Sequence, residues 1–286
     1  MDLLVNLVGR LPGPWLKAIG RLQWRSPLLK KSFEWAANQV RNQDAVIQQG
    51  TGKGLRFNTG NSNTGYLLGT TEPAMQIAIK ELLQPGMTFY DVGANVGFFS
   101  TIAARLSGGV VVCFEPLAEN VEHIKHNAAL NHFNNLVIRS EALGCEDGDA
   151  VFNVSAVNSW GKLATVGIPA QKVRDITVPI RRLDTIVRES NIPQPGLIKI
   201  DVEGAEVDVL VGAKETLTSS RPILLIELHG TNEVVAQKLE ELRYQGYVLG
   251  SAASITRSPW DAQVLALPTE RIDLVDVVEK LTKPIT

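Results

Sequence analysis

The stretch "TFYDVGANVGFFS", residues 88–100, determines how the rest of the chain is interpreted. It begins as an apolar run typical of a buried strand, reaches Asp91 and two glycines, and then returns to apolar residues. Gly93 and Gly97 allow the backbone to turn tightly and to approach a ligand without interference from a Cβ atom. A helix beginning near Asn95 would direct its unpaired N–H groups into the same space, which favours an anionic or carboxylate-bearing ligand. The stretch therefore predicts a strand, a glycine turn and a helix that together hold a ligand.

From Pro85 onward, short runs rich in Val, Ile and Leu alternate with amphipathic segments. Strands are expected at residues 88–92, 110–115, 136–140, 197–202 and 223–228. Helices are expected at residues 96–106, 117–131, 205–217 and 233–244. Nearly continuous apolar strands separated by helices are typical of a parallel sheet that is covered on both faces. The alternation therefore predicts a doubly wound α/β domain.

Two parts of the chain differ from this alternation. Residues 1–48 contain three of the five tryptophans and more basic than acidic residues, and we expect an N-terminal helical extension there. This extension either packs on the main domain as a cap or rests on a membrane surface or a large substrate. Residues 49–286 are expected to form the main domain, with 49–85 as a lead-in or lid segment and 143–180 as a hairpin insertion.

Composition restricts the classes of function. The net charge of −2 does not suggest a nucleic-acid partner. Two cysteines without a CxxC pair argue against a disulfide scaffold, and four scattered histidines show no HExxH pattern. No apolar run approaches the roughly 20 residues of a bilayer span, and we recognise no secretory signal. A cytoplasmic location is expected, with peripheral membrane contact through the N-terminal segment as an open alternative.

Carboxylates follow the predicted strands at the edge of the sheet where the glycine turn lies. Asp91 ends the first strand and could hold a ligand ammonium group. Glu115, followed by Pro116 in "VVCFEP", ends the second strand, where a carboxylate commonly binds a ribose diol. The second glycine of GxGxxG is missing, which argues against a pyrophosphate. This combination predicts S-adenosylmethionine (SAM) rather than NAD.

The stretch "LIKIDVEGAEVDVLVGA" places two more acids after the next buried strand, and His229 follows the one after that. Asp201, Glu203 and His229 are the candidate catalytic residues, as general base or as groups that orient an acceptor. Alternatively, Glu203 only favours the first turn of the next helix, and His229 is structural. Asp201 and Glu203 could instead hold a divalent cation, but no metal is the favoured interpretation.

In this order, the motifs resemble the FkbM family of SAM-dependent methyltransferases over roughly residues 49–250. The matching stretches are "EPAMQIAIKELLQPGMTFYDVGANVGFFSTIAA", "VVCFEPLAENVEHIKHNAALN", "VPIRRLDTIV", "LIKIDVEGAEVDVLVGAKETL" and "RPILLIELHG". The resemblance implies a class I methyltransferase fold, which is Rossmann-like and doubly wound. Its sheet has seven mostly parallel strands, the last of which is antiparallel. The implied activity is O-methylation of a hydroxyl on a sugar, a polysaccharide or a natural-product scaffold.

The resemblance also implies roles for individual residues. Those expected beside SAM are Glu72, Asp91, Gly93, Ala94, Asn95, Gly97, Glu115, Pro116, Glu141, Ala142 and Asp201. Tyr66 falls in the segment that closes over the cofactor. Independently of the resemblance, the polar insertion is expected to face the acceptor, a small molecule or glycan, and the candidate substrate residues are Tyr66, Asn158, Ser159 and Trp160. Alternatively, Trp160 is a packing residue. The stretch "GTTEP" departs from the family, in which a bulky residue precedes the acid corresponding to Glu72.

Two other classes of function remain open from the sequence. One is a nucleotide-dependent oxidoreductase built on the same sheet, against which the missing GxGxxG counts. The other is a non-catalytic binding or scaffold protein that has kept the fold, against which the acids at three strand ends count.

Overall fold

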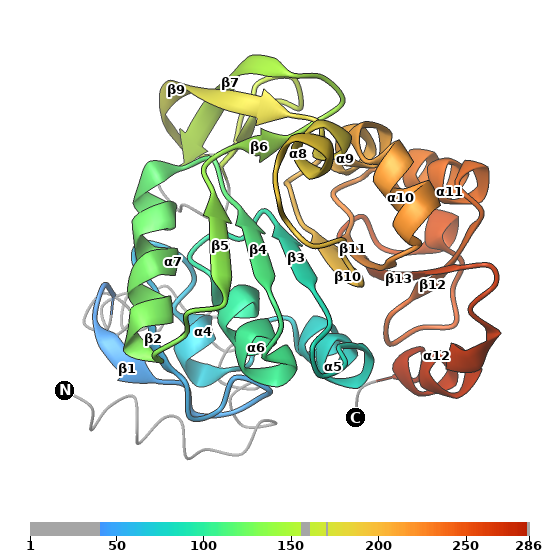
Figure 1. The fold of residues 1–286 in the computed structure, drawn as a ribbon, viewed down its shortest axis with the longest axis horizontal. Helices are drawn as coiled ribbons and strands as arrows, with labels where there is room; N and C mark the ends of the chain where they lie inside the picture. The colour runs from blue at the N-terminus through green and yellow to red at the C-terminus, as the bar shows by residue number, and fades with distance from the viewer. Residues whose placement is uncertain (1–40, 156–160, 170, 285–286) are drawn as a thin grey trace, which may run out of the picture.

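The computed structural model describes residues 41–155, 161–169 and 171–284, and its main sheet has seven strands (Figure 1). Their order is β12-β13-β11-β10-β3-β4-β5. The strands are β3 (Phe89–Val92), β4 (Val111–Phe114), β5 (Leu136–Arg139), β10 (Leu197–Ile200), β11 (Ile223–Glu227), β12 (Tyr244–Val248) and β13 (Gln263–Pro268). All pairs are parallel except the two made by β13, which runs antiparallel to β11 and β12. The predicted doubly wound sheet with an antiparallel last strand is confirmed.

The order of the strands reverses between β3 and β10. The chain adds β4 and β5 on one side of β3, and then places β10 and β11 on its other side. At such a point, the loops that follow the two strands diverge and leave a crevice at the carboxyl ends of the strands. The loop after β3, residues 93–97, and the loop after β10, residues 201–205, therefore border this crevice.

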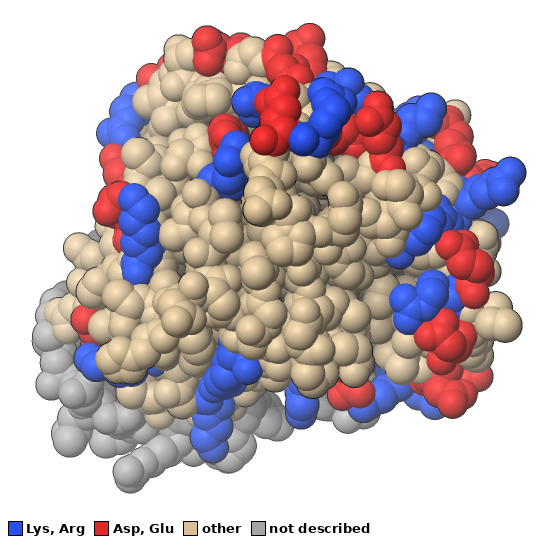
Figure 2. Space-filling view, in the orientation of Figure 1, with Lys and Arg blue, Asp and Glu red and all other residues tan. Residues whose placement is uncertain are grey.

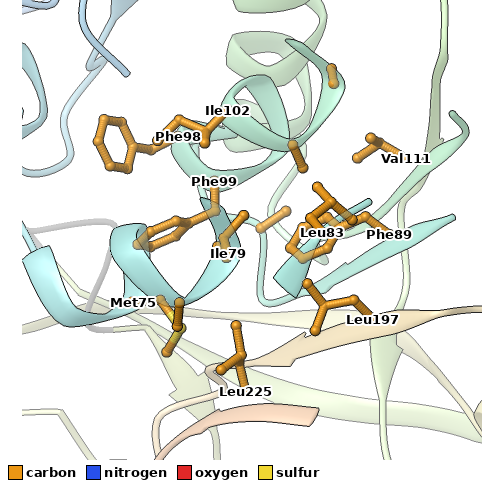
Figure 3. Close-up of a cluster of buried hydrophobic side chains, with 14 of the residues drawn as sticks. Met75, Ile79, Leu83, Phe89, Phe98, Phe99, Ile102, Val111, Leu197 and Leu225 are labelled. Atoms are coloured by element: carbon orange, nitrogen blue, oxygen red, sulfur yellow. The ribbon is translucent and has the colours of Figure 1, made fainter. Parts of the chain in front are cut away.

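Each face of the sheet has its own hydrophobic core, because successive strand residues point to opposite faces. One core packs α5, α6 and α12 against alternate strand residues such as Phe89 and Leu197, as the close-up in Figure 3 shows for α5 and α6. The other packs α8, α9, α10 and α11 against Tyr90, Ile198 and their neighbours. The helices are α4 (Gly65–Leu68), α5 (Pro73–Leu82), α6 (Phe98–Ser107), α7 (Ala118–Leu130), α8 (Leu183–Glu189), α9 (Glu206–Gly212), α10 (Lys214–Ser220), α11 (Asn232–Glu241) and α12 (Val275–Leu281).

Two predicted helices differ from the observed ones. The helix expected at 205–217 is divided into α9 and α10 next to Gly212, where a Cβ atom would lie only 1.9 Å from the carbonyl oxygen of Gly144. The helix expected at 233–244 ends at Glu241, and Arg243 adopts a left-handed φ of 57° that turns the chain into β12. The helices α8 and α12 are not expected from the sequence.

A second, four-stranded sheet lies over the carboxyl ends of the main strands, at the top of Figure 1. It consists of β6 (Ala142–Leu143), β7 (Gly148–Ser155), β8 (Lys162–Leu163) and β9 (Lys172–Arg181). Its centre is the antiparallel pairing of β7 with β9, in the part of the chain where a hairpin insertion is expected. We call this sheet the roof.

The N-terminal part of the described chain begins with a strand pair. β1 (Asp44–Val46) pairs antiparallel with β2 (Arg56–Asn58), so the domain boundary expected at residue 48 falls between two paired strands. Most of the helical extension expected at 1–48 lies outside the described residues, as do Asn158, Ser159 and Trp160. None of the helices described is both long and apolar enough to cross a bilayer. On the face shown in Figure 2, basic and acidic side chains are interspersed around the edges of the molecule.

A lysine lies in the middle of the buried strand β10. Lys199 is directly opposite Asp91 of β3 in the register, and both side chains are almost completely buried. The Lys199 Nζ atom lies 3.1 Å from Asp91 Oδ1 and donates a hydrogen bond of 3.0 Å to the carbonyl oxygen of Gly93. A buried charge is tolerated only when it is paired and hydrogen-bonded. This ion pair therefore joins the two strands that flank the crevice.

Replacing Lys199 by Met leaves the buried carboxylate of Asp91 without its cation, so we expect the free energy of unfolding to fall by about 3–5 kcal/mol. Adding Asp91→Asn removes the unpaired charge and should recover part of this loss. Urea denaturation followed by circular dichroism measures both effects. Lys125→Met is the control, because Lys125 is exposed and pairs with an exposed Glu122. Equal losses of unfolding free energy in Lys199→Met and Lys125→Met would contradict the role of the buried pair.

Candidate active site

A cavity of about 200 Å³ lies between the carboxyl ends of the main strands and the roof. Its described lining residues are Asn63, Tyr66, Glu72, Val92, Gly93, Asn95, Phe114, Glu115, Pro116, Glu141, Ala142, Leu143, Phe152, Gly161, Leu163, Asp201, Val202, Glu203, Ala205 and Glu227. The crevice at the reversal of the strand order is therefore the site of the cavity. Segments from many parts of the chain contribute to its wall.

The wall of this cavity is acidic. Six of its lining residues are carboxylic acids, and none of its described lining residues is Lys, Arg or His. Lys199 lies beneath the wall, where Asp91 and Asp201 surround it. Burial would lower the pKa of Lys199, but the charges of these two aspartates raise it above its ordinary value. The cavity therefore favours a ligand that carries positive charge.

The loop after β3 approaches the loop after β10 very closely. Gly93 has a φ of +74°, and a Cβ atom there would lie 1.8 Å from the carbonyl oxygen of Asp201. Asn95 also has a positive φ, of 51°, and its N–H donates a hydrogen bond of 2.8 Å to Glu115 Oε2. Gly97, with a φ of +83°, precedes the first turn of α6. Only glycine fits at position 93, and this contact sets the width of the crevice.

Glu115 is held at the end of β4 by three donors. Besides the N–H of Asn95, the N–H of Leu117 and the amide of Asn120 donate hydrogen bonds to Oε1. Burial raises the pKa of Glu115 to about 7, although these donors and the charge of Lys199 lower it. The carboxylate therefore has a fixed position in the cavity wall and titrates near neutral pH.

The structure places the residues expected beside SAM in two groups. The cavity wall contains Glu72, Gly93, Asn95, Glu115, Pro116, Glu141, Ala142 and Asp201, whereas Ala94, Gly97 and Asp91 are not part of it. Asp91 is fully buried, pairs with Lys199 and accepts a hydrogen bond of 2.5 Å from Ser100. This placement does not support the expected direct contact of Asp91 with a ligand ammonium group. A carboxylate at a buried position of β3 requires an internal cation. Asp91 therefore holds Lys199 in place, and Lys199 in turn donates a hydrogen bond to Gly93 in the loop after β3.

Two further acids meet on the side of the cavity that is formed by α5 and β11. Gln263 of β13 donates hydrogen bonds of 3.2 Å to Glu72 and 3.1 Å to Glu227. Burial, followed by the charge of Glu227, raises the pKa of Glu72 well above its ordinary value. Burial and the charge of Asp201 also raise the pKa of Glu227. Glu72 has a left-handed φ of 46°, a conformation that is costly for a non-glycine residue.

The three candidate catalytic residues come together at the end of β10 and β11. His229 Nε2 lies 3.9 Å from Asp201 Oδ1 and 3.8 Å from Glu203 Oε2. Burial raises the pKa of Glu203 to about 7. Burial alone would lower the pKa of His229, but its hydrogen bond with Glu206 and the nearby carboxylates raise it to about 9. The surrounding carboxylates thus favour the protonated form of His229 in the ligand-free protein, and a metal cation that bound there would have to displace this proton.

Several important residues are missed by the sequence analysis. Lys199 and Glu227 do leave a signal, because each is a charged residue in a strand that is otherwise apolar. Glu206 is not among the candidate residues of the sequence analysis, yet it is fully buried and accepts hydrogen bonds from Thr231 and Gly204. Gln263 reaches the site only through the pairing of β13 with β11, which leaves no local signal.

The strand order and the position of the cavity are those of a class I methyltransferase. The family model described as "Methyltransferase FkbM domain" matches residues 91–249, which is more than half of the chain. The chain therefore belongs to the FkbM methyltransferase family, and membership of this family implies the use of SAM.

The curated relatives are distant. Hexuronic acid methyltransferase AglP of Haloferax volcanii is 28% identical over 142 residues, which cover 49% of this chain and 55% of that protein. The 31-O-demethyl-FK506 methyltransferase FkbM of Streptomyces tacrolimicus is 27% identical over 195 residues, covering 58% of this chain and 75% of that protein. The 2-O-methyltransferase NoeI of Sinorhizobium fredii is 27% identical over 154 residues, which cover 49% of this chain and 63% of that protein. The chain thus spans about half the length of the first of these relatives.

We expect Gly93→Ala to lower the free energy of unfolding by more than about 3 kcal/mol, because the new Cβ atom would overlap a backbone carbonyl. Gly86→Ala is the matched control, since Gly86 has a similar φ of +78° but no heavy atom within 4 Å of an added Cβ atom. There, the left-handed backbone alone should cost about 1–2 kcal/mol. Chemical denaturation compares the two variants. A similar loss in both would show that the contact with Asp201 does not require glycine.

Proposed function

We propose that this protein is a SAM-dependent O-methyltransferase that acts on a hydroxyl of a sugar, a polysaccharide or a natural-product scaffold. The observation that carries the proposal is the acidic cavity at the reversal of the strand order. SAM carries a sulfonium and an ammonium group, so it complements a wall with six carboxylic acids. A dinucleotide would instead bring two phosphates to a wall whose described residues include no Lys or Arg, which counts against an oxidoreductase.

The residues of the wall fit the parts of SAM in the order of the strands. Gly93 and Asn95 would border the methionine part, and Glu115 at the end of β4 would accept a hydrogen bond from the ribose through Oε2, which has one donor where Oε1 has two. Glu141 and Ala142, which follow β5, lie beside the adenine. Glu141 is kept in position by two hydrogen bonds from Arg139. These assignments support SAM without using Asp91 as a direct contact.

The acceptor is proposed to lie between the ends of β10 and β11 and the roof. When SAM is bound, it supplies a methyl group on a positively charged sulfur, so that the acceptor oxygen bonds to carbon as the carbon–sulfur electron pair returns to sulfur. The acceptor hydroxyl must then lose its proton. Asp201 and Glu203 line the cavity there, and they are positioned to assist this loss, with His229 directly behind them. The intact acids at three strand ends argue against a scaffold protein without activity.

The names of the relatives and the apolar lining of the roof support a hydroxyl-bearing small molecule or glycan as the acceptor. The relatives described above are named as methyltransferases of a hexuronic acid, of a demethylated FK506 and of a 2-O position. Phe152 and Leu163 of the roof add apolar surface to the cavity, which suits the carbon face of such a scaffold. Tyr66 stacks on Phe98 at 4.5 Å and holds the lead-in segment against the wall. A cytoplasmic location remains part of the proposal, with peripheral membrane contact of the N-terminal segment as the alternative.

Isothermal titration calorimetry should detect SAM binding in the micromolar range and no comparable binding of NADH. Glu115→Ala should weaken SAM binding at least tenfold, because it removes the acceptor for the ribose hydroxyls. Glu119→Ala is the control, since Glu119 is an exposed acid in α7. NADH binding without SAM binding would contradict the proposed function.

Methylated products formed from labelled SAM and a set of neutral glycosides, uronic acid glycans and macrolides would then identify the acceptor class.

SAM affinity should rise with pH between about 6 and 8. The pKa of Glu115 is about 7 in the ligand-free protein, and only its ionised form accepts hydrogen bonds with both oxygens. Ribose hydroxyls therefore favour the ionised carboxylate, and binding of SAM releases a proton when it begins below this pKa. Titrations over this range with the wild type and with Glu115→Gln measure the effect. An identical slope in the two proteins would exclude Glu115 as its source.

A further inference from the structure

We propose that Asp201, Glu203 and His229 bind a divalent transition-metal ion at the acceptor end of the cavity. The binding of the ion follows from the side chains alone. Its role, which is to activate the acceptor hydroxyl, rests on the proposed function. Nothing in the comparisons with known proteins assigns such a site.

The three side chains have the spacing of ligands that share one ion. One ligand atom from each of the three residues lies within 4.8 Å of the other two. The imidazole Nε2 is 3.8 Å from the Glu203 carboxylate and 3.9 Å from the Asp201 carboxylate. Two ligands at about 2.0–2.2 Å from one ion are separated by at most about 4.4 Å, so both distances fit coordination with little movement.

The orientation of His229 is the independent observation that points to a ligand. Its side chain is only 9% exposed, and its Nδ1 atom shares a hydrogen bond of 2.9 Å with Glu206 Oε1. The Nε2 atom faces the two carboxylates at distances too long for a hydrogen bond, and no described residue is closer to it in a polar contact. Glu206 is itself fixed by the Thr231 hydroxyl and the Gly204 N–H. A carboxylate bound to the other ring nitrogen is the usual support of a metal-ligating histidine.

A neighbouring set of acids is a poorer site for a cation. Glu72, Asp201 and Glu227 also converge, but Gln263 already donates hydrogen bonds to two of them. Lys199 supplies a positive charge to this set, 3.4 Å from Asp201 Oδ2. The other oxygen of Asp201, Oδ1, faces His229 instead. Asp201 therefore places one oxygen towards the internal cation and leaves the other for a metal ion.

The ligand set also indicates the class of ion. Two carboxylates and one imidazole favour Mn²⁺ or another first-row transition ion over Mg²⁺ or Ca²⁺, which prefer oxygen ligands. Three protein ligands leave coordination positions open to the cavity that Asp201 and Glu203 line. A hydroxyl bound there would have a lowered pKa. The two carboxylates then act on the acceptor through the ion, and the proton that the hydroxyl loses passes to solvent water.

Titration with Mn²⁺, followed by the electron paramagnetic resonance signal of the free ion, tests the site in the full chain without any substrate. We expect one site with micromolar affinity, and weaker binding of Mg²⁺ in competition. His229→Gln and Glu203→Gln should each weaken Mn²⁺ binding at least tenfold. Glu141→Gln is the matched control, because it removes an acid from the same cavity outside the cluster and should change the affinity less than threefold.

Thermal unfolding of each variant shows whether it has kept its fold, and SAM titration of the wild type tests the proposed function separately. Absence of Mn²⁺ binding in the wild type, or equal losses in Glu203→Gln and Glu141→Gln, would overturn the proposal. If His229→Gln does not fold, Glu203→Gln alone decides the outcome. Mn²⁺ binding in a protein that does not bind SAM would support the metal site and contradict only the proposed function, so the two failures are distinguishable.

Discussion

The pairing of Lys199 with Asp91 is the interaction on which the rest of the site depends. It joins the two central strands of the sheet at the point where their order reverses, and it does so in a region without water to solvate either charge. The same ammonium group binds the carbonyl of Gly93 and lies beside Asp201. One buried cation therefore fixes the start of both loops that border the cavity, and their separation follows from it.

This arrangement also determines the electrostatics of the cavity. Lys199 lies beside the site, and its charge is shared between Asp91 in the core and Asp201 of the wall. Cationic side chains offset part of the acidity of the wall: Arg139 pairs with Glu141, Lys199 lies 3.4 Å from Asp201, and His229 lies 3.8 Å from Glu203. Burial, together with the charges of neighbouring carboxylates, raises the pKa values of Glu72, Glu203 and Glu227 above their ordinary value. The remaining positive charge has to come from what binds there.

Local patterns of the sequence are sufficient to predict the sheet but not the whole site. Strands β3, β4, β5, β10 and β11 are recognisable because each is a short apolar run, and the ligand loop is recognisable because two glycines follow a strand-ending acid. The pairing of Asp91 with Lys199, which keeps Asp91 out of the cavity, cannot be predicted from local patterns. It depends on the register between strands that lie about a hundred residues apart in the sequence. For the same reason, Gln263 and the break at Gly212 are evident only once distant segments are placed together. Polar residues at strand ends can be found from the sequence, whereas their partners require the fold.

The wall of the cavity is assembled from segments that extend from residue 63 to residue 227. A ligand bound there contacts both halves of the sheet and the roof at once, so it cannot be retained by any partly unfolded form in which one of these has detached. Ligand binding therefore raises the free energy of unfolding of the whole domain rather than that of one loop. Amides throughout the sheet, including those far from the ligand, should exchange with solvent more slowly when the site is filled. Occupancy of the site thereby becomes a determinant of how long the protein survives in the cell.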